Sequence, residues 1–379
     1  MLRHRFERFS EPDRLHVAAH SHHFWPDVTF EAQQRAWLDA AVLVDEKWEG
    51  IFGGLMATTQ SHIGRVLGLP DPATVSFAPS THELVVRLVS CLDRPFTMVT
   101  TDAEFHSLRR QAARWEEGGV ARVVRVPAEP YATFPHRFAR TVADVDPDLV
   151  YLSHVFYDSG YVVPELAGIV AAVPREETLV VFDGYHAFMA MPVDLGTVCD
   201  RAFYLAGGYK YAMAGEGVCF MHCPAGYGPR PLDTGWMAEF GALTSAGDDV
   251  GYAVDGTRFL GATFDPSAFY RFNAAQDMLL DEGVDAADIH THVRRLQATF
   301  VDRLDGSPLS ADMVIPAWDG HTDRGNFVTF RTTGAARLRD ALREHGVITD
   351  YRRDRPRFGF GVYHDEGDVD RLLGILKHL

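Results

Sequence analysis

Lys210 is the residue best suited to covalent chemistry in this sequence, and it lies in the segment Gly207-Gly-Tyr-Lys-Tyr211. The two glycines allow the backbone to approach a ligand closely. A lysine held there in partial desolvation has a lowered pKa and can form a Schiff base with a carbonyl compound. The alternative for Lys210 is an exposed loop lysine without a chemical role.

A second reactive group is the carboxylate of Asp183, which follows the apolar stretch Leu179-Val-Val-Phe182 and precedes Lys210 by 27 residues. An aspartate at the end of a strand, with a Schiff-base lysine after it, suits pyridoxal phosphate. The carboxylate pairs with the ring nitrogen and keeps it protonated. The alternative for Asp183 is a helix N-cap. His186 is suited to support Asp183 or the edge of the ring, and the alternative is a buried histidine with satisfied hydrogen bonds.

A turn suited to an anion comes earlier, where Pro79-Ser80-Thr81 precedes a helical run that begins at Glu83. Two hydroxyl groups and the free amides of a helix N-terminus favour a phosphate group. The alternative is ordinary N-capping. The order of a phosphate turn, a strand-end aspartate and then a lysine is far more specific than any one of the three, and it predicts pyridoxal phosphate as cofactor.

The elements that must position these residues alternate along the chain. Short apolar strands separated by helices predict an α/β fold, in which a mixed, mainly parallel sheet lies between helices. Ligand groups in such sheets lie at the carboxyl ends of strands, where Asp183 and the Ser80-Thr81 turn are expected. The expected strands are 73–77, 97–100, 121–126, 149–152, 179–182, 202–205 and 217–222, and the expected helices between them are 83–91, 107–117 and 164–173.

The two ends of the chain differ from this middle part. A long helical stretch is expected over 27–67, and the tail predicts a small α+β domain with strands 327–331 and 357–361. We therefore expect an N-terminal segment 1–45 at the mouth of the active site, a large cofactor-binding domain 46–265 and a small domain 266–379. The helices expected in the small domain are 267–280, 289–303, 334–345 and 368–378.

Composition excludes several classes of protein. The chain has 379 residues and a formal net charge of −16, which argues against binding nucleic acid or an anionic membrane surface. Its four cysteines do not form a disulfide framework, and Cys219 and Cys223 lack a second pair for zinc. Without an apolar N-terminal stretch or a long apolar run, a cytoplasmic enzyme is expected.

Several motifs resemble those of the kynureninase group within the class V aminotransferase family, which has the fold type I architecture of pyridoxal-phosphate enzymes. Asp183-Gly-Tyr-His186 and Gly208-Tyr-Lys-Tyr211 resemble the aspartate and lysine segments of that group. The matching segments extend from about His20 to Tyr363, so that the resemblance covers nearly the whole chain. The other segments that carry it are 191–195, 258–263, 346–352 and 357–360.

The resemblance implies roles that the residues alone do not. Lys210 would carry the cofactor and move the Cα proton, and Tyr209 would bind the phosphate and act as a general acid. Either Phe105 or His106 would stack on the ring. In a homodimer with shared sites, the partner subunit would supply the residues that correspond to Trp236 and Thr263. Arg357 would bind the α-carboxylate of the substrate with a bidentate fork. The alternatives are a core aromatic for Trp236 and a surface cation for Arg357.

The sequence also departs from the family pattern. His20-Ser21-His22-His23 replaces an asparagine-serine-leucine-glycine turn. Three histidines in four residues could suggest a metal site, but no carboxylate or cysteine has a fitting spacing. A bound metal ion is therefore not expected. We expect His20, Ser21 and His22 to line the substrate mouth, with an exposed polar loop as the alternative. Further departures, expected on the substrate side, are Phe156, Asp158 and the segment 237–239.

The resemblance favours a hydrolase that acts on an amino acid of the kynurenine type. Such an enzyme cleaves the Cβ–Cγ bond and releases alanine and an aromatic acid. The alternative is a class V aminotransferase, or another pyridoxal-phosphate lyase that processes a β or γ position. Cysteine desulfuration needs a nucleophilic cysteine in the C-terminal part, and no cysteine follows Cys223. A binding module without catalysis would be expected to have lost Lys210 or Asp183.

Overall fold

A seven-stranded sheet forms the centre of the computed structural model, which describes residues 1–379 except 10–12, 227–229, 243–249 and 321. The strand order is β2-β8-β7-β6-β5-β3-β4, and only β8 runs antiparallel to both of its neighbours. The mixed, mainly parallel α/β sheet predicted from the sequence is confirmed. The strands are β2 (Val75–Ala78), β3 (Phe96–Thr101), β4 (Ala121–Val126), β5 (Leu149–Ser153), β6 (Leu179–Asp183), β7 (Ala202–Gly207) and β8 (Cys219–His222).

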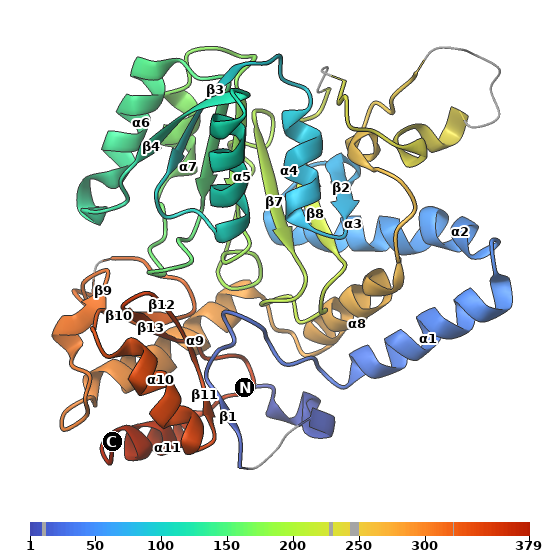
Figure 1. Ribbon diagram of the computed structural model, residues 1–379. Coiled ribbons are helices and arrows are strands. Elements are labelled where there is room, and N and C mark those ends of the chain that lie inside the picture. Colours follow the sequence, from blue (N-terminus) through green and yellow to red (C-terminus); the bar gives the residue numbers. More distant parts are fainter. Residues whose placement is uncertain (10–12, 227–229, 243–249, 321) are drawn as a thin grey trace.

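Helices cover both faces of this sheet (Figure 1), and two apolar cores lie between the helices and the sheet. Alternate residues of a strand point to opposite faces, so Tyr151 and Val181 face one core while Leu152 and Phe182 face the other. The helices α4 (Thr81–Val89) and α5 (His106–Glu117) cover the first face. The second is covered by α3 (Met56–Leu67), α6 (Phe134–Val145), α7 (Leu166–Ala171) and α8 (Ser267–Asp281).

The C-terminal part forms a separate antiparallel sheet, drawn in orange and red in Figure 1. Its strand order is β12-β13-β10-β9. A two-stranded parallel sheet joins β1 (Leu15–His16) near the N-terminus to β11 (Val347–Ile348), so the first and last parts of the chain lie together. The remaining elements here are α9 (Ala286–Asp302), β9 (Val314–Ile315), β10 (Val328–Phe330), α10 (Ala335–Glu344), β12 (Asp350–Arg352), β13 (Arg355–Phe358) and α11 (Glu366–Leu376).

The long helix expected over 27–67 is interrupted. It consists of α1 (Val28–Leu43), α2 (Lys47–Gly50), a π-helical turn over Ile51–Leu55, and α3. Val44 ends α1 with a φ of 51°, a conformation that a β-branched residue rarely adopts.

Two helices near the large sheet depart from the expected organisation. The sequence did not predict α6, although Phe134, Phe138 and Val142 are buried at helical spacing. The helix α8 packs against α1 and α3, so it lies beside the large sheet although the expected division assigns it to the small domain. Among the described residues, no helix is both long and apolar enough to cross a membrane.

Candidate active site

A cavity of about 240 Å³ lies at the edge of the sheet where the parallel strands end. The loop between β2 and α4, the end of β6, and the loop after β7 all contribute to it, as expected for an α/β sheet. The fold thereby brings together residues spread over 130 positions of the sequence, from Ser80 to Lys210. The predicted site residues that line the cavity are Ser80, Thr81, Phe105, Asp183, His186, Tyr209 and Lys210.

Lys210 is buried in this cavity, with 5% of its surface exposed. Its Nζ atom lies 2.9 Å from Nε2 of His186 and 4.5 Å from the centre of the Tyr185 ring. Burial lowers the pKa of the Lys210 amine to about 7, an effect that Asp183 opposes and Arg357 reinforces. A large fraction of Lys210 is therefore uncharged near neutral pH, which a nucleophile or a general base requires.

Asp183 ends β6 and directs its carboxylate into the same cavity. The Tyr151 hydroxyl donates a hydrogen bond of 2.9 Å to Oδ2, and the backbone N–H of Tyr185 donates one of 3.0 Å to Oδ1. Burial raises the pKa of Asp183, while the Tyr185 amide, Lys210 and Tyr151 counteract that rise. The carboxylate is thus held in a fixed position with lone pairs left for a further donor.

The turn before α4 has the geometry expected of an N-cap. Ser80 is in an extended conformation, and its side chain accepts a hydrogen bond of 3.3 Å from the backbone N–H of Glu83. Ser80 and Thr81 also line the cavity, so the capping alternative and the anion-binding interpretation apply to the same turn. The helix N-terminus offers further backbone N–H groups to an anion, although that of Thr81 also faces the Cys219 sulfur.

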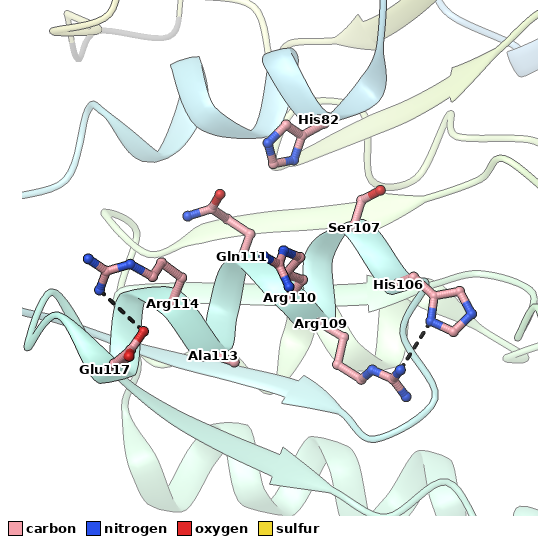
Figure 2. Close-up of a pocket in the computed structure, with 9 residues that line it drawn as sticks. All are labelled: His82, His106, Ser107, Arg109, Arg110, Gln111, Ala113, Arg114 and Glu117. Carbon is pink, nitrogen blue, oxygen red and sulfur yellow. Dashed lines mark hydrogen bonds and ion pairs between the residues drawn. The ribbon is translucent and has the colours of Figure 1, made fainter.

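The structure separates Phe105 from His106. Phe105 lines the cavity, and its ring centre lies 5.6 Å from Nζ of Lys210. His106 instead begins α5 and lines a neighbouring groove, where its Nδ1 atom lies 3.1 Å from a guanidinium nitrogen of Arg109 (Figure 2). Of the two candidates for stacking on a cofactor ring, Phe105 has the suitable position.

Tyr209 connects the cavity to the N-terminal segment. Its ring packs at 4.8 Å from that of Tyr185, and His22 stacks on it at 4.9 Å. Burial raises the pKa of the Tyr209 hydroxyl to about 12, so this group stays protonated and can donate a proton. Ser21 lies beside His22, at 3.4 Å from its Nδ1 atom, and neither residue lines the cavity itself.

Arg357 and His20 are buried next to the cavity rather than in its wall. Asp350 lies opposite Arg357 in the β12–β13 pair and accepts two hydrogen bonds from its guanidinium group, one of them 2.8 Å long from Nε. Nε2 of His20 lies 3.0 Å from the same carboxylate. Burial alone would raise the pKa of Asp350, but His20 and Arg357 hold it well below its usual range. The guanidinium group of Arg357 was expected to bind the substrate, but one of its edges is occupied by Asp350.

Trp236 and Thr263 form a pair away from the cavity of their own chain. Nε1 of Trp236 donates a hydrogen bond of 3.1 Å to the Thr263 hydroxyl, and 37% of the Trp236 surface is exposed. Neither residue lines the cavity that contains Lys210. A contribution of this pair to cofactor binding would therefore have to come from a second copy.

The residues that differ from the family pattern lie in different parts of the structure. Phe156 is fully buried and packs on Phe134 in the apolar core, and Met237 is also fully buried. Asp158 forms an ion pair of 2.6 Å with Arg355. Phe156 and Met237 therefore contribute to packing, and Asp158 joins the large domain to β13.

Four residues that support the cavity carry no obvious signal in the sequence. Tyr151 and Tyr185 hold Asp183, and they resemble ordinary core aromatics. Glu104 precedes Phe105 and is almost completely buried; the Ser153 hydroxyl donates a hydrogen bond of 2.5 Å to it. Burial raises the pKa of Glu104 to about 7. The signal that was available for Glu104 is its place directly before a ring-stacking candidate.

Buried neutral histidines are expected to make the protein unstable in mild acid. Burial lowers the pKa of His16 to about 3 and those of His20 and His23 to about 4, from an ordinary value of 6.5. The unfolded chain therefore binds more protons below pH 6.5, and each histidine removes about 1.4 kcal/mol of stability per pH unit as the pH falls toward its folded pKa. Glu104 acts in the opposite direction, because its pKa is raised, and offsets about one histidine.

Denaturant unfolding at pH 7, 6 and 5 measures this dependence. We expect the free energy of unfolding to fall by about 3 kcal/mol or more for each pH unit below pH 6, since burial also lowers the pKa values of His154 and His292 to about 4. The variant His23→Gln should show a smaller slope, whereas His378→Gln, at an exposed position, should keep the slope of the parent. A stability that is constant from pH 6.5 to pH 5 would contradict the neutral-histidine interpretation.

Residues 48–350 match the family model described as aminotransferase class V. The chain belongs to the class V aminotransferase family. As a member of this family it is an enzyme that depends on pyridoxal phosphate. Within the described residues, no group of three or more histidine, cysteine, aspartate or glutamate side chains could hold a metal ion.

This class V aminotransferase family member is similar to curated proteins of two kinds. It is 29% identical over 241 residues to a kynureninase of Deinococcus radiodurans, covering 60% of this chain and 56% of that one. It is 27% identical over 353 residues to an isopenicillin N epimerase of Streptomyces clavuligerus, covering 86% and 84%. The alignment thus spans little more than half of the kynureninase.

Solved structures with the same fold include two enzymes of sulfur chemistry. The cystine C–S lyase C-DES superposes with a TM-score of 0.81 at 19% identity, covering 98% of this chain and 99% of that one. The cysteine desulfurase CsdA from Escherichia coli superposes with a TM-score of 0.80 at 16% identity, covering 99% and 96%. At these identities the likeness establishes the fold, which is the predicted fold type I architecture.

The cavity fits pyridoxal phosphate chemically. Lys210 provides an amine of lowered pKa for the aldehyde, Asp183 provides a fixed carboxylate for the ring nitrogen, and α4 provides an N-terminus for the phosphate. Nδ1 of His186 is buried and has no hydrogen-bond partner among the residues that the structure describes, so a ligand atom can bind to it. A buried polar atom without a partner indicates that the structure is completed by something else.

Proposed function

We propose that Lys210 binds the cofactor covalently and that this enzyme acts as a kynureninase-like hydrolase on an amino acid. The observation that supports the proposal most directly is the buried Lys210 amine, with a pKa lowered to about 7, in one cavity with the strand-end carboxylate of Asp183. When bound, the cofactor withdraws electrons from the Cα atom of an amino acid. The side chains then have to orient the substrate and move its protons.

Each side chain has a role that follows from its position. Lys210 takes a proton from Cα, since a base with a pKa near 7 is suited to this at neutral pH. Asp183 holds the ring nitrogen, and Phe105 lies where it covers a ring face. Tyr209, which stays protonated, donates a proton to Cβ as the acyl part of the side chain leaves as the acid. Arg357 binds the α-carboxylate with the N–H groups that its bonds to Asp350 and to the Tyr157 carbonyl leave over.

The kynureninase relative supports cleavage of the Cβ–Cγ bond. In this reaction one water molecule is consumed, and an amino acid with a carbonyl group at Cγ gives alanine and a carboxylic acid. The match with the isopenicillin N epimerase covers more of this chain and favours a second candidate. In that candidate, an epimerase or an aminotransferase, the side chain of the substrate remains intact.

Product analysis distinguishes the two candidates. Purified holoenzyme is incubated with kynurenine, 3-hydroxykynurenine and a panel of other amino acids, and the products are identified by mass spectrometry and chiral chromatography. Release of alanine with an acid supports the hydrolase. An oxo acid or a substrate of inverted configuration would exclude it in favour of the second candidate. Reduction with borohydride, followed by peptide mapping, independently tests whether the cofactor is attached to Lys210.

We also propose a homodimer with shared active sites, in the cytoplasm. The pairing of Trp236 with Thr263 outside their own cavity supports the shared site. The described residues contain no disulfide bond, as is usual in a reducing compartment. Mixing a Lys210→Ala chain with a Trp236→Ala chain should restore up to about a quarter of the sites if subunits exchange at random. No recovery of activity, with exchange verified by differently tagged chains, would refute shared sites.

A further inference from the structure

A second and larger hollow adjoins the cofactor cavity. This open groove has a volume of about 860 Å³ and runs along one side of α5, facing His82 at the start of α4 (Figure 2). Both hollows are lined by His82 and Ser107, so the groove continues directly from the cavity. None of the roles assigned so far uses it.

The sizes of the two hollows indicate what the groove contains. Sites for small molecules usually measure about 300–1,000 Å³, and the inner cavity, at about 240 Å³, lies below that range. The cofactor and a complete substrate therefore do not both fit in the inner cavity. Part of the substrate has to extend outward, and the groove is the space that adjoins Ser107 and His82.

The wall of the groove is basic. Three arginines of α5 line it, namely Arg109, Arg110 and Arg114. The single carboxylate among its lining residues, that of Glu117, lies 3.5 Å from Arg114 and is paired with it (Figure 2). The protein has a net charge of −16, so this concentration of positive charge is not part of a generally basic surface.

The passage between groove and cavity is also positive. A guanidinium nitrogen of Arg109 lies 3.1 Å from Nδ1 of His106, whose ring lies 5.3 Å from that of Tyr157 in the cavity wall. Burial and Arg109 lower the pKa of His106, and Arg352 and Arg357 of the small domain add to this effect. Cations of both domains therefore act on this passage.

We propose that this groove binds a carboxylate at the far end of the substrate's side chain, so that the enzyme prefers amino acids with a second acid group. The inference rests on the proposed function, because it assumes that the amino acid is bound at Lys210. Arg110 and Arg109 lie nearest the shared lining residue Ser107 in the sequence of α5, and they are the residues that recognise the distal acid. Several arginines that act together on one carboxylate give a preference larger than an isolated exposed ion pair.

Matched pairs of amino acids test the proposal. Aspartate with asparagine, glutamate with glutamine, and 2-aminoadipate with its δ-amide differ only in the distal charge. Their dissociation constants are measured from changes in the visible absorption of the holoenzyme. We expect the acid to bind about tenfold more tightly than the amide in at least one pair. This preference should weaken as salt is added.

Single substitutions identify the groove as the source of the preference. Arg110→Gln and Arg109→Gln should reduce it to about threefold or less, with the visible absorption of the cofactor unchanged. Arg140→Gln is the matched control, because Arg140 is also an exposed helical arginine near an acid, on α6. It should keep the full preference.

Two results would overturn the inference. One is equal affinity for acid and amide in all three pairs. The other is an undiminished preference in both arginine variants, in particular if these variants dissociate into monomers, since the groove would then contact a second copy. An enzyme without visible absorption after incubation with pyridoxal phosphate would instead refute the proposed function, so the two failures are distinguishable.

Discussion

Replacing Lys210 with alanine is expected to abolish the visible absorption of the purified enzyme and to lower the turnover rate by more than about 10³-fold. Lys210 is the buried amine in the cavity, and its pKa is lowered to about 7. An alanine at this position can neither bind an aldehyde nor move a proton. Absorption spectra and single-turnover measurements check the two parts of this prediction separately.

The variant Lys210→Arg is the matched control for charge. It retains a cation near His186 and Asp183 but has no amine that can bind the aldehyde. We expect it to be as inactive as Lys210→Ala. Substantial activity of Lys210→Arg would show that Lys210 acts only through its charge, and a visible chromophore in Lys210→Ala that survives dialysis would show that the cofactor is held without Lys210.

Asp183→Asn is expected to leave the visible absorption in place and to lower the rate by about 10²–10⁴-fold, the range typical of a group that assists proton transfer. Asparagine keeps an oxygen for the Tyr185 amide and has nearly the same shape, so the fold should be preserved. It removes the negative charge that holds a proton on the ring nitrogen. The colour of this variant distinguishes it from Lys210→Ala.

The same substitution has an effect that does not depend on activity. Asp183 raises the pKa of Lys210, so removing its charge should lower that pKa below about 7. The pH dependence of Lys210 modification by an amine reagent in the apoprotein measures the shift. An unchanged or raised pKa in Asp183→Asn would contradict the assigned coupling. Tyr151→Phe, which removes a hydrogen bond but no charge, serves as the control.

The gathering of Asp183, Lys210 and the Ser80-Thr81 turn in one cavity was predictable from the sequence. Asp183 could be placed at a strand end because an uninterrupted apolar run precedes it, and Lys210 because glycines and tyrosines surround it. The strand β6, which ends in Asp183, and the strand β7, which precedes Lys210, were predicted within one or two residues, since β-branched and aromatic runs carry a strong local signal. Membership of the class V aminotransferase family is confirmed.

The partners of these residues were not predictable in the same way. Tyr151 reaches Asp183 because β5 and β6 pair with Tyr151 opposite Val181, which puts Tyr151 and Asp183 on the same face in diagonal positions. Such a contact depends on register, and register is a property of the folded sheet. The pairing of Asp350 with Arg357 depends in the same way on the β12–β13 register. Once that hairpin is assumed, opposite charges at paired positions are a usable signal.

The histidine segment was the least predictable part. A run of three histidines in four residues suggests an exposed or metal-binding loop, yet His20 and His23 are buried. They are buried because two distant parts of the chain are in contact. Ala18 forms a β-bridge with Gly359, and His20 forms a hydrogen bond with Asp350. His22 stacks on Tyr209, and the lining of the substrate mouth by His20, Ser21 and His22 stays a prediction.

That contact has a consequence for how the protein is made. His20 and Asp350 are separated by 330 positions, and a Cβ atom at Gly359 would lie only 2.3 Å from the His20 ring, so the two segments fit closely. On the ribosome the first segment emerges long before the last one exists. The first segment therefore stays undocked until residues 350–359 have also been synthesised. Arg357 and Asp350 therefore meet His20 only after β12 and β13 have been translated. A nascent chain that lacks these strands would have a cofactor pocket without an ordered entrance.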